Sequence, residues 1–315
     1  MLNIQEPDED APLDHGRRGR WIDLCGPGPD EVRRAAELAG VDERLMEHAL
    51  DLHECPRIEV DDEATLLILR APYLEGGQGG VRHSTLPIGV VLTPSALVTV
   101  CRQADPALAA ILRKARVKGG DTRPEHLICA LIKGVAQLFM HYLKDISARI
   151  QEVEQDLSRS RSNDDLRILL TLQKSVTYFH AALKTNDFII DRLVRKGLTV
   201  GTGARLAFTE DEVDGLDDAL TDTRQGIYMS KIFNEVLNSI SNVYSSIISN
   251  SVNQIMKVLT SLTVVLMIPT LVTSMYGMNI TLPLQDHPRA FALVAGGTAA
   301  LTTAIIVLLK RSRML

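Results

Sequence analysis

Two long apolar segments near the C-terminus dominate the pattern of hydrophobic and polar positions in this chain. The first, residues 258–275, contains no charged residue and no histidine. As a helix it would rise roughly 27 Å, close to the hydrocarbon thickness of a bilayer. The second, residues 290–309, is also free of charge. A buried core helix is a poorer account of two such runs, so the pattern predicts two transmembrane helices joined by a short loop.

The first segment and the residues before it also carry a regular polar pattern. Its members recur at alternating intervals of three and four residues: Asn253, Met256, Thr260, Thr263, Met267, Thr270 and Ser274. On an α-helix this spacing places them on one slowly drifting stripe, although Ser261 and Thr273 fall off it. Polar groups in a bilayer prefer water or another helix to lipid, so the stripe should face inward. It is either a helix-packing seam or, with several copies around an axis, a pore lining.

The N-terminal part predicts a small α/β domain. Residues 1–20 are polar with mixed charge, and we expect them to be disordered. Strand-like runs and two short helical segments then alternate over residues 21–120, with a mixed or antiparallel sheet. The expected strands lie at 21–24, 57–60, 64–74, 87–92 and 96–101, and the expected helices at 30–38 and 42–50.

From residue 124 onward the apolar positions follow helical spacing. Residues 121–208 should form an antiparallel helical pair, about 125–158 and 164–196, followed by a flexible glycine-rich link over 197–203.

A stalk helix should then cover residues 209–276 and include the first transmembrane segment, about 258–276. From Glu210 to Met275 it would span about 66 residues and be roughly 100 Å long. Gly215 and Gly226 are its weak points, because glycine costs about 1 kcal/mol relative to alanine in a helix. The sequence thus predicts an α+β membrane protein with a stalk helix and two C-terminal transmembrane helices per subunit.

Charge and composition restrict the location and the class of function. The net charge of -5 argues against a nucleic-acid partner, and the N-terminal residues lack the pattern of a cleavable signal. Four scattered cysteines show no zinc-like spacing, and His53-Glu54-Cys55 is too cramped for a convincing metal site. No phosphate-binding glycine loop or catalytic triad is recognisable, so we expect neither an enzyme nor an organic cofactor.

The distribution of basic residues predicts the orientation in the membrane. They gather at one side of the two segments, as Lys257, Lys310, Arg311 and Arg313, whereas the connecting loop 277–289 carries Arg289 alone. The positive-inside rule places both termini and the basic tail 310–315 in the cytoplasm and the loop outside.

The residues that close the first segment point to a family. Tyr276-Gly277-Met278-Asn279 stands at its outer end, with Pro269 inside the segment and the run IMKVLT at residues 255–260. With the basic end KRSR at 310–313, this arrangement resembles the CorA family of divalent-cation channels. The runs ALDLHECPRIEVDDEATLLILRAP and PIGVVLTPSALVTV resemble the cytoplasmic domain of the same family, so the resemblance covers nearly the whole chain.

The resemblance implies a homo-oligomeric, pentameric channel in the cell inner membrane. It would place Asn279 in a ring at the outer mouth and Thr270 in a polar ring further in. Met256, Leu259 and Met267 would narrow the path as candidates for a gate. Neutral oxygens suit a hydrated Mg²⁺, which sheds its water reluctantly, better than a carboxylate ring that would hold it too firmly. Mg²⁺, with Co²⁺ or Ni²⁺ as further cargo, would enter down the membrane potential.

An acidic run at the start of the stalk helix has two interpretations. Acids favour a helix N-terminus, so residues 209–218 can be a solvated helix start. Alternatively, they form a divalent sensor between subunits, because Asp218 matches a family position that helps to bind the regulatory Mg²⁺. Asp217 and Asp222 are its candidate companions.

Two other functions remain open at this point. One is a zinc transporter of the related branch, with or without proton coupling, although Met278 favours the magnesium branch. The other is a non-conducting membrane-anchored scaffold or sensor, against which the polar stripe argues.

The loop ITLPLQDHP departs from the more acidic loop of many family members, so the attraction of cations at the mouth should differ.

Overall fold

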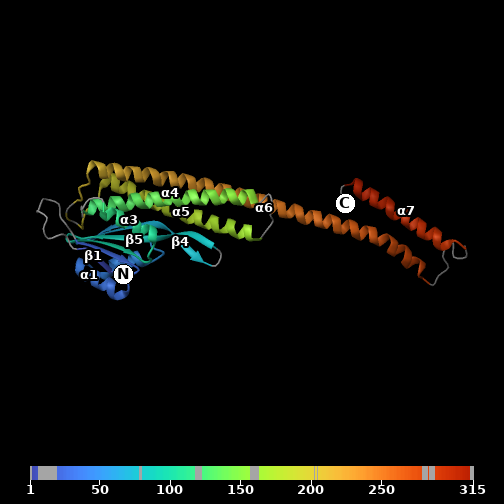
Figure 1. The fold of residues 1–315 in the computed structure, drawn as a ribbon, viewed down its shortest axis with the longest axis horizontal. Coiled ribbons are helices and arrows are strands. Elements are labelled where there is room, and N and C mark those ends of the chain that lie inside the picture. Colours follow the sequence, from blue (N-terminus) through green and yellow to red (C-terminus); the bar gives the residue numbers. More distant parts are fainter. Residues whose placement is uncertain are drawn as a thin grey trace. The chain divides into compact units, whose positions relative to one another are not determined.

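The computed structural model describes residues 2–5, 20–77, 80–117, 123–156, 163–201, 203, 205–278, 283 and 288–312. The chain divides into two compact units, Met1–Ile240 and Ser241–Leu315. One long helix, α6 (Glu210–Tyr276), contributes residues to both units (Figure 1). Each unit is described by itself below.

A mixed sheet of six strands is the centre of the first unit, in the order β1-β2-β6-β5-β4-β3. Only β2 and β6 run parallel, and the other neighbours are antiparallel. The long β4–β5 hairpin extends the pairing from Thr65 and Leu92 out to Gly77 and Gly80. The strands are β1 (Leu2–Gln5), β2 (Arg20–Cys25), β3 (Arg57–Val60), β4 (Thr65–Gly77), β5 (Gly80–Leu92) and β6 (Ala96–Cys101).

The first strand corrects an expectation. Residues 1–20 were expected to be disordered, but Leu2–Gln5 pairs antiparallel with β2, with Ile4 opposite Ile22. Its sequence alternates apolar and polar residues, as a strand needs, and pairing gives its backbone groups hydrogen-bond partners. Arg20 likewise belongs to β2, whereas residues 6–19 lie outside the part of the chain that the structure describes.

Helices cover both faces of this sheet (Figure 1). The short helices α1 (Pro29–Ala39) and α2 (Glu43–Leu50) pack on one face, over a core that includes Ile22, Leu66 and Val98. At Gly89 of β5 an added Cβ would lie 2.3 Å from Cβ of Ala49, so glycine lets α2 approach the sheet closely.

Longer helices bury the opposite face. These are α3 (Pro106–Val117), α4 (Pro124–Asp156) and α5 (Asn163–Lys196), whose core includes Trp21, Leu67 and Phe139. Helix α3 was not among the helices predicted from the sequence. Its first turn is capped by Asp105, whose Oδ1 accepts hydrogen bonds from the backbone N–H groups of Ala107 and Leu108.

Polar contacts fasten α5 and the link after it to β4. The side-chain amide of Asn186, 2% exposed, accepts from the N–H of Arg70 at 3.0 Å and donates to its carbonyl at 2.7 Å. The Thr65 hydroxyl donates to the carbonyl of Thr199 and accepts from the N–H of Gly201. Hydrogen bonds to the sheet therefore hold the link in place, although its glycine-rich sequence predicted a flexible segment.

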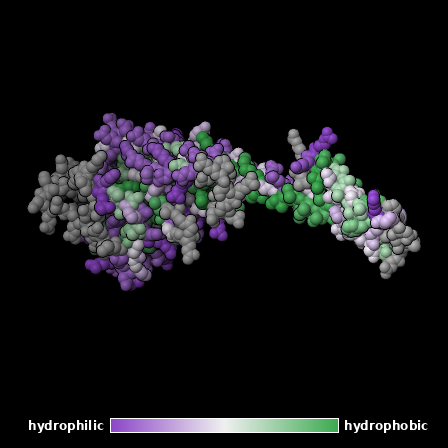
Figure 2. Space-filling model, turned by 45° about the vertical axis from the view of Figure 1, so that its right-hand side comes forward, coloured by the Kyte–Doolittle hydropathy of each residue, from purple (hydrophilic) through white to green (hydrophobic). Residues whose placement is uncertain are grey.

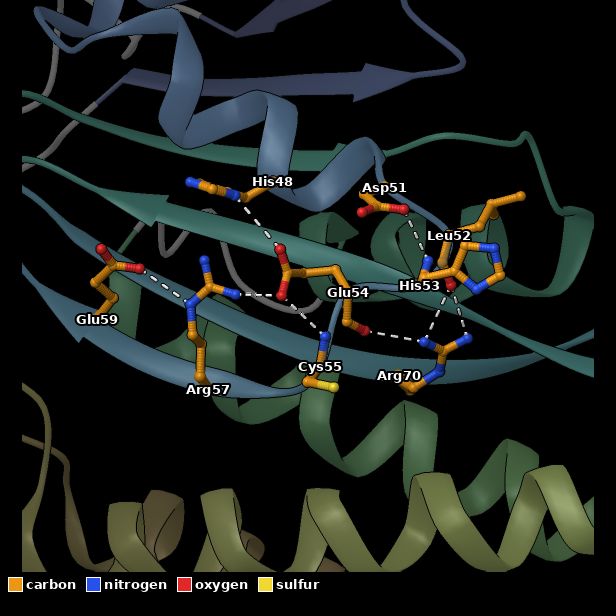
Figure 3. A network of polar contacts seen from close by, with 9 residues as sticks. All are labelled: His48, Asp51, Leu52, His53, Glu54, Cys55, Arg57, Glu59 and Arg70. Atoms are coloured by element: carbon orange, nitrogen blue, oxygen red, sulfur yellow. Dashed lines mark hydrogen bonds and ion pairs between the residues drawn. The ribbon is translucent and has the colours of Figure 1, made fainter.

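The loop between α2 and β3 contains the His53-Glu54-Cys55 run, and its polar groups serve packing (Figure 3). The guanidinium of Arg70 donates to the carbonyls of Leu52 and Glu54 and to Thr85. The Glu54 carboxylate lies against Arg57 and 3.4 Å from Nδ1 of His48. The run anchors the loop to the sheet.

Within the first unit α6 packs closely on its neighbours. At Gly215 an added Cβ would lie 3.1 Å from Sγ of Cys129 in α4, and at Gly226 it would lie 3.1 Å from Leu183 in α5. These glycines, expected as weak points of the helix, are therefore positions where a neighbouring helix comes close. The intrinsic cost of glycine is offset by packing.

The second unit contains the C-terminal part of α6 and all of α7 (Ala290–Arg311), which fold back on one another (Figure 1). Figure 2 shows hydrophobic side chains on the surface of these helices, whereas the first unit is mostly hydrophilic outside. By length and composition α4, α6 and α7 could each cross a membrane. In the most apolar window of α4, 56% of residues are buried, against 6% in α6 and α7. The α4 helix is thus a core helix, and α6 and α7 are the membrane candidates.

Candidate conduction path and regulatory carboxylates

The polar stripe lies on the side of α6 that faces away from α7. A groove of about 990 Å³ separates the C-terminal end of α6 from α7, and the α6 helix lines it with Pro269, Val272, Thr273 and Tyr276. At 100° per residue, the stripe is centred about 160° around the helix from these residues. Every residue of the stripe from Asn253 to Ser274 is exposed in the single subunit.

The two polar residues that fall off the stripe have other surroundings. Ser261 is fully buried, and Thr273 lines the groove beside α7. Thr273 therefore belongs to the face of α6 that is turned toward α7, and Ser261 to a buried position.

Threonines of the stripe present oxygen lone pairs outward. The hydroxyl of Thr263 donates to the carbonyl of Leu259 at 2.9 Å, and that of Thr270 donates to the carbonyl of Leu266 at 2.8 Å. A hydroxyl has one proton and two lone pairs, so a proton used by the helix leaves an acceptor. Acceptors suit a cation or the protons of its water shell.

Apolar side chains interrupt the stripe. Met256, Leu259 and Met267 are all more than half exposed in the single subunit, with Met267 at 63%. In a ring of several copies they would form apolar constrictions, which can lose their water.

The helix ends at the tetrapeptide predicted for the pore mouth. The N–H of Gly277 donates to the carbonyl of Thr273, and the Tyr276 hydroxyl donates to the carbonyl of Pro283 at 3.2 Å. Tyr276 and Met278 are exposed. Asn279, the amide on which the prediction depends most, lies outside the described residues, as do most loop residues up to Pro288.

The acidic run at the start of α6 divides into structural and exposed members. Glu212, 7% exposed, closes a capping box: its carboxylate accepts from the N–H of Thr209, whose hydroxyl accepts from the N–H of Glu212. Its other oxygen lies 2.9 Å from Nη2 of Arg123. Glu212 therefore serves the helix start, as the first interpretation proposed.

The residues predicted as a sensor differ from Glu212. Asp217 and Asp218 are exposed and Asp222 is half-buried. Oδ2 of Asp218 lies 3.4 Å from Nζ of Lys133 in α4. Among the described residues of this single subunit, no three His, Cys, Asp or Glu side chains are grouped so that they could hold a metal ion. Asp218 alone therefore cannot form a complete site.

Lys133 was not found from the sequence. It lies 85 positions before Asp218, and only the packing of α4 beside α6 brings the two together. The capping box, in contrast, was present in the sequence as Thr-x-x-Glu at residues 209–212.

Comparison with known proteins identifies relatives of the whole chain. The chain is 26% identical over 315 residues to the cobalt/magnesium transport protein CorA of Methanocaldococcus jannaschii, covering 98% of this chain and 96% of that protein. The complete structure of the CorA magnesium transporter from the same organism matches with a TM-score of 0.80 and 25% identity, covering 99% and 98% of the two chains.

A weaker likeness is to a further solved structure. The ZntB cytoplasmic domain from Vibrio parahaemolyticus matches with a TM-score of 0.56 and 15% identity, covering 74% of this chain and 88% of that one, and shares the fold alone.

The family of CorA-like Mg²⁺ transporter proteins matches residues 17–311, nearly the whole chain. The chain belongs to this family of CorA-like Mg²⁺ transporter proteins.

Proposed function

We propose that this chain assembles into a homo-oligomer, a pentamer by family resemblance, that conducts Mg²⁺ across the cell inner membrane. Co²⁺ and Ni²⁺ are further candidate ions. The observation that carries the proposal is the polar stripe on the side of α6 opposite the α7 groove, with threonine oxygens directed outward as acceptors. A scaffold or sensor that only anchors in the membrane has no use for such a stripe.

The chemistry of the stripe suits an ion that keeps its water. Mg²⁺ dehydrates reluctantly, so neutral oxygens that bind its shell permit both entry and release. In the proposed path Asn279 receives the hydrated ion at the mouth, and Thr270 and Thr263 follow along the helix. Rings of Met267, Leu259 and Met256 narrow the path and close it when they lose water.

The membrane potential is sufficient to drive this uptake. A potential of 100 mV supplies about 2.3 kcal/mol per charge, or about 4.6 kcal/mol for a divalent ion. Since about 1.4 kcal/mol corresponds to a factor of ten, the limit is about three decades of accumulation. Both termini lie in the cytoplasm in this proposal, as the positive-inside rule predicts from Lys257 and the basic C-terminal tail.

Regulation by internal Mg²⁺ is the second part of the proposal. Asp218, with Asp217 and Asp222, would meet carboxylates of a neighbouring subunit, and the like charges repel unless a cation lies between them. Carboxylate oxygens are the ligands that Mg²⁺ prefers. High internal Mg²⁺ would therefore hold the subunits together in a closed state.

The outer mouth provides the direct test of conduction. Asn279→Ala should abolish most Mg²⁺ uptake by cells that depend on this protein, while the assembled protein remains in the membrane. Asn250→Ala is the matched control, because Asn250 is an exposed amide of α6 that lies off the stripe. Uptake at the wild-type rate by an assembled Asn279→Ala protein would refute the proposed path.

A further inference from the structure

Lys133 of α4 holds the carboxylate that the proposed regulation depends on. Its Nζ lies 3.4 Å from Oδ2 of Asp218, and the side chains of Lys133 and Asp218 are 42% and 73% exposed. The carboxylate has the oxygen ligands that Mg²⁺ prefers, so the residue type fits the ion. The ammonium, however, is itself a cation beside that oxygen, so it competes with any other cation for it.

This ion pair differs from the one next to it. In the Arg123–Glu212 pair the Glu212 side chain is almost buried and also belongs to the capping box, so this pair fixes the start of α6. Lys133 and Asp218 meet in solvent, where an ion pair contributes little to folding. Lysine is also a compact charge on a flexible stem, so it can move aside where an arginine fork would stay.

We propose that Lys133 is a tethered counter-cation of Asp218, which a divalent ion must displace before it binds there. This inference rests on the proposed regulatory role of Asp218. Lys133 would keep the carboxylate neutralised at low Mg²⁺ and raise the Mg²⁺ concentration at which the subunits close. An exposed ion pair changes an equilibrium by up to about fivefold, and repulsion between the ammonium and the arriving ion acts in the same direction.

Protease protection of the full-length protein in lipid tests the inference without any transport measurement. Chymotrypsin is suitable, because it does not cut at lysine and no variant removes a cleavage site. With Mg²⁺ as the titrant, Lys133→Gln should reach half-maximal protection at about three- to tenfold lower Mg²⁺ than wild type. Lys133→Arg keeps the charge and should require at least as much Mg²⁺ as wild type.

A second lysine of the same helix serves as the charge control. Lys144 is exposed, and Lys144→Gln removes the same charge about 16 Å away along α4, so its midpoint should equal that of wild type. If Mg²⁺ protects the wild type and Lys133→Gln has the same midpoint Mg²⁺ concentration, the role of Lys133 is overturned but the proposed regulation is not. An equal shift in both glutamine variants would also overturn it, since net charge would then explain the effect. Absence of any Mg²⁺ protection in wild type would overturn the proposed regulation and this inference together.

Discussion

Asn186 should be among the most sensitive positions of the first unit, because one buried side chain satisfies two main-chain groups. It accepts from the N–H of Arg70 at 3.0 Å and donates to the carbonyl of Arg70 at 2.7 Å. The pairing of β4 with β3 ends at Ile68, so no strand residue replaces these bonds. Asn186→Ala therefore removes the partners of the Arg70 N–H and carbonyl, which meet the amide at a site where Asn186 is 2% exposed.

The structure sets the size of the effect. A buried polar group that loses its partner costs about 1–3 kcal/mol, so two cost about 2–6 kcal/mol. For a unit of this length, 1 kcal/mol shifts the melting temperature by about 2–4 °C. Asn186→Ala should lower the melting temperature of the first unit by at least about 4 °C, and by 10 °C or more if neither group finds water.

Fluorescence of the chain's single tryptophan follows this unit. Trp21 is 2% exposed in the core beneath α4 and α5, so its emission reports loss of the core on heating full-length protein in detergent. Asn238→Ala is the control. It removes an exposed hydrogen bond of 2.8 Å, which the side-chain amide of Gln173 donates to Oδ1 of Asn238, and it should shift the melting temperature by less than 2 °C. Equal shifts for the two variants would refute the argument that Asn186 completes the backbone bonding of β4.

Three further predictions test the core, the packing and the pore. Burial lowers the pKa of His83 to about 4, below its ordinary 6.5, so its neutral form contributes stability that is lost as pH falls from about 6.5 to about 4. In urea unfolding, the free energy of unfolding of the wild type should fall by up to about 3 kcal/mol over this pH range, and His83→Phe should remove this fall. An identical fall in both proteins would contradict the role of His83. Gly89→Ala should destabilise the first unit by about 1–3 kcal/mol in the same assay, since its Cβ would overlap Cβ of Ala49 at 2.3 Å, and wild-type stability would contradict the close approach. Met267→Ser should raise the ion current and keep it flowing at internal Mg²⁺ concentrations that close the wild-type channel. Leu266→Ser, about 100° around the helix, should not raise the current. Equal currents in the two variants would mean that the wrong face of α6 was assigned to the pore.

The membrane part of the fold was predictable because its signals are local. A charge-free run of bilayer length needs no partner to be recognised, and the spacing of the stripe is fixed by the helix itself. Strand β1 was missed because four residues in a polar segment carry little pattern without β2 beside them. Helix α3 was missed although Asp105 before Pro106 is a readable start signal.

Long-range polar contacts could not be predicted from the sequence. Asn186 and Arg70 are 116 positions apart, and Lys133 and Asp218 are 85 apart. Nothing near either residue in the chain specifies its partner, since the contact exists only once helices and sheet have packed. The glycine-rich link illustrates the same limit: its composition indicates flexibility, but Thr65 fixes it from 134 positions away.

Mg²⁺ flux through the purified protein in liposomes tests the central claim most directly. A Mg²⁺-sensitive dye inside the vesicles should report entry that increases when an inside-negative potential of about 100 mV is imposed, and Asn279→Ala should remove most of it. The entry should not require a proton gradient, which separates a magnesium channel from a proton-coupled zinc transporter. Vesicles that take up Zn²⁺ only with a proton gradient, or that take up no divalent ion under any potential while holding assembled protein, would contradict the account.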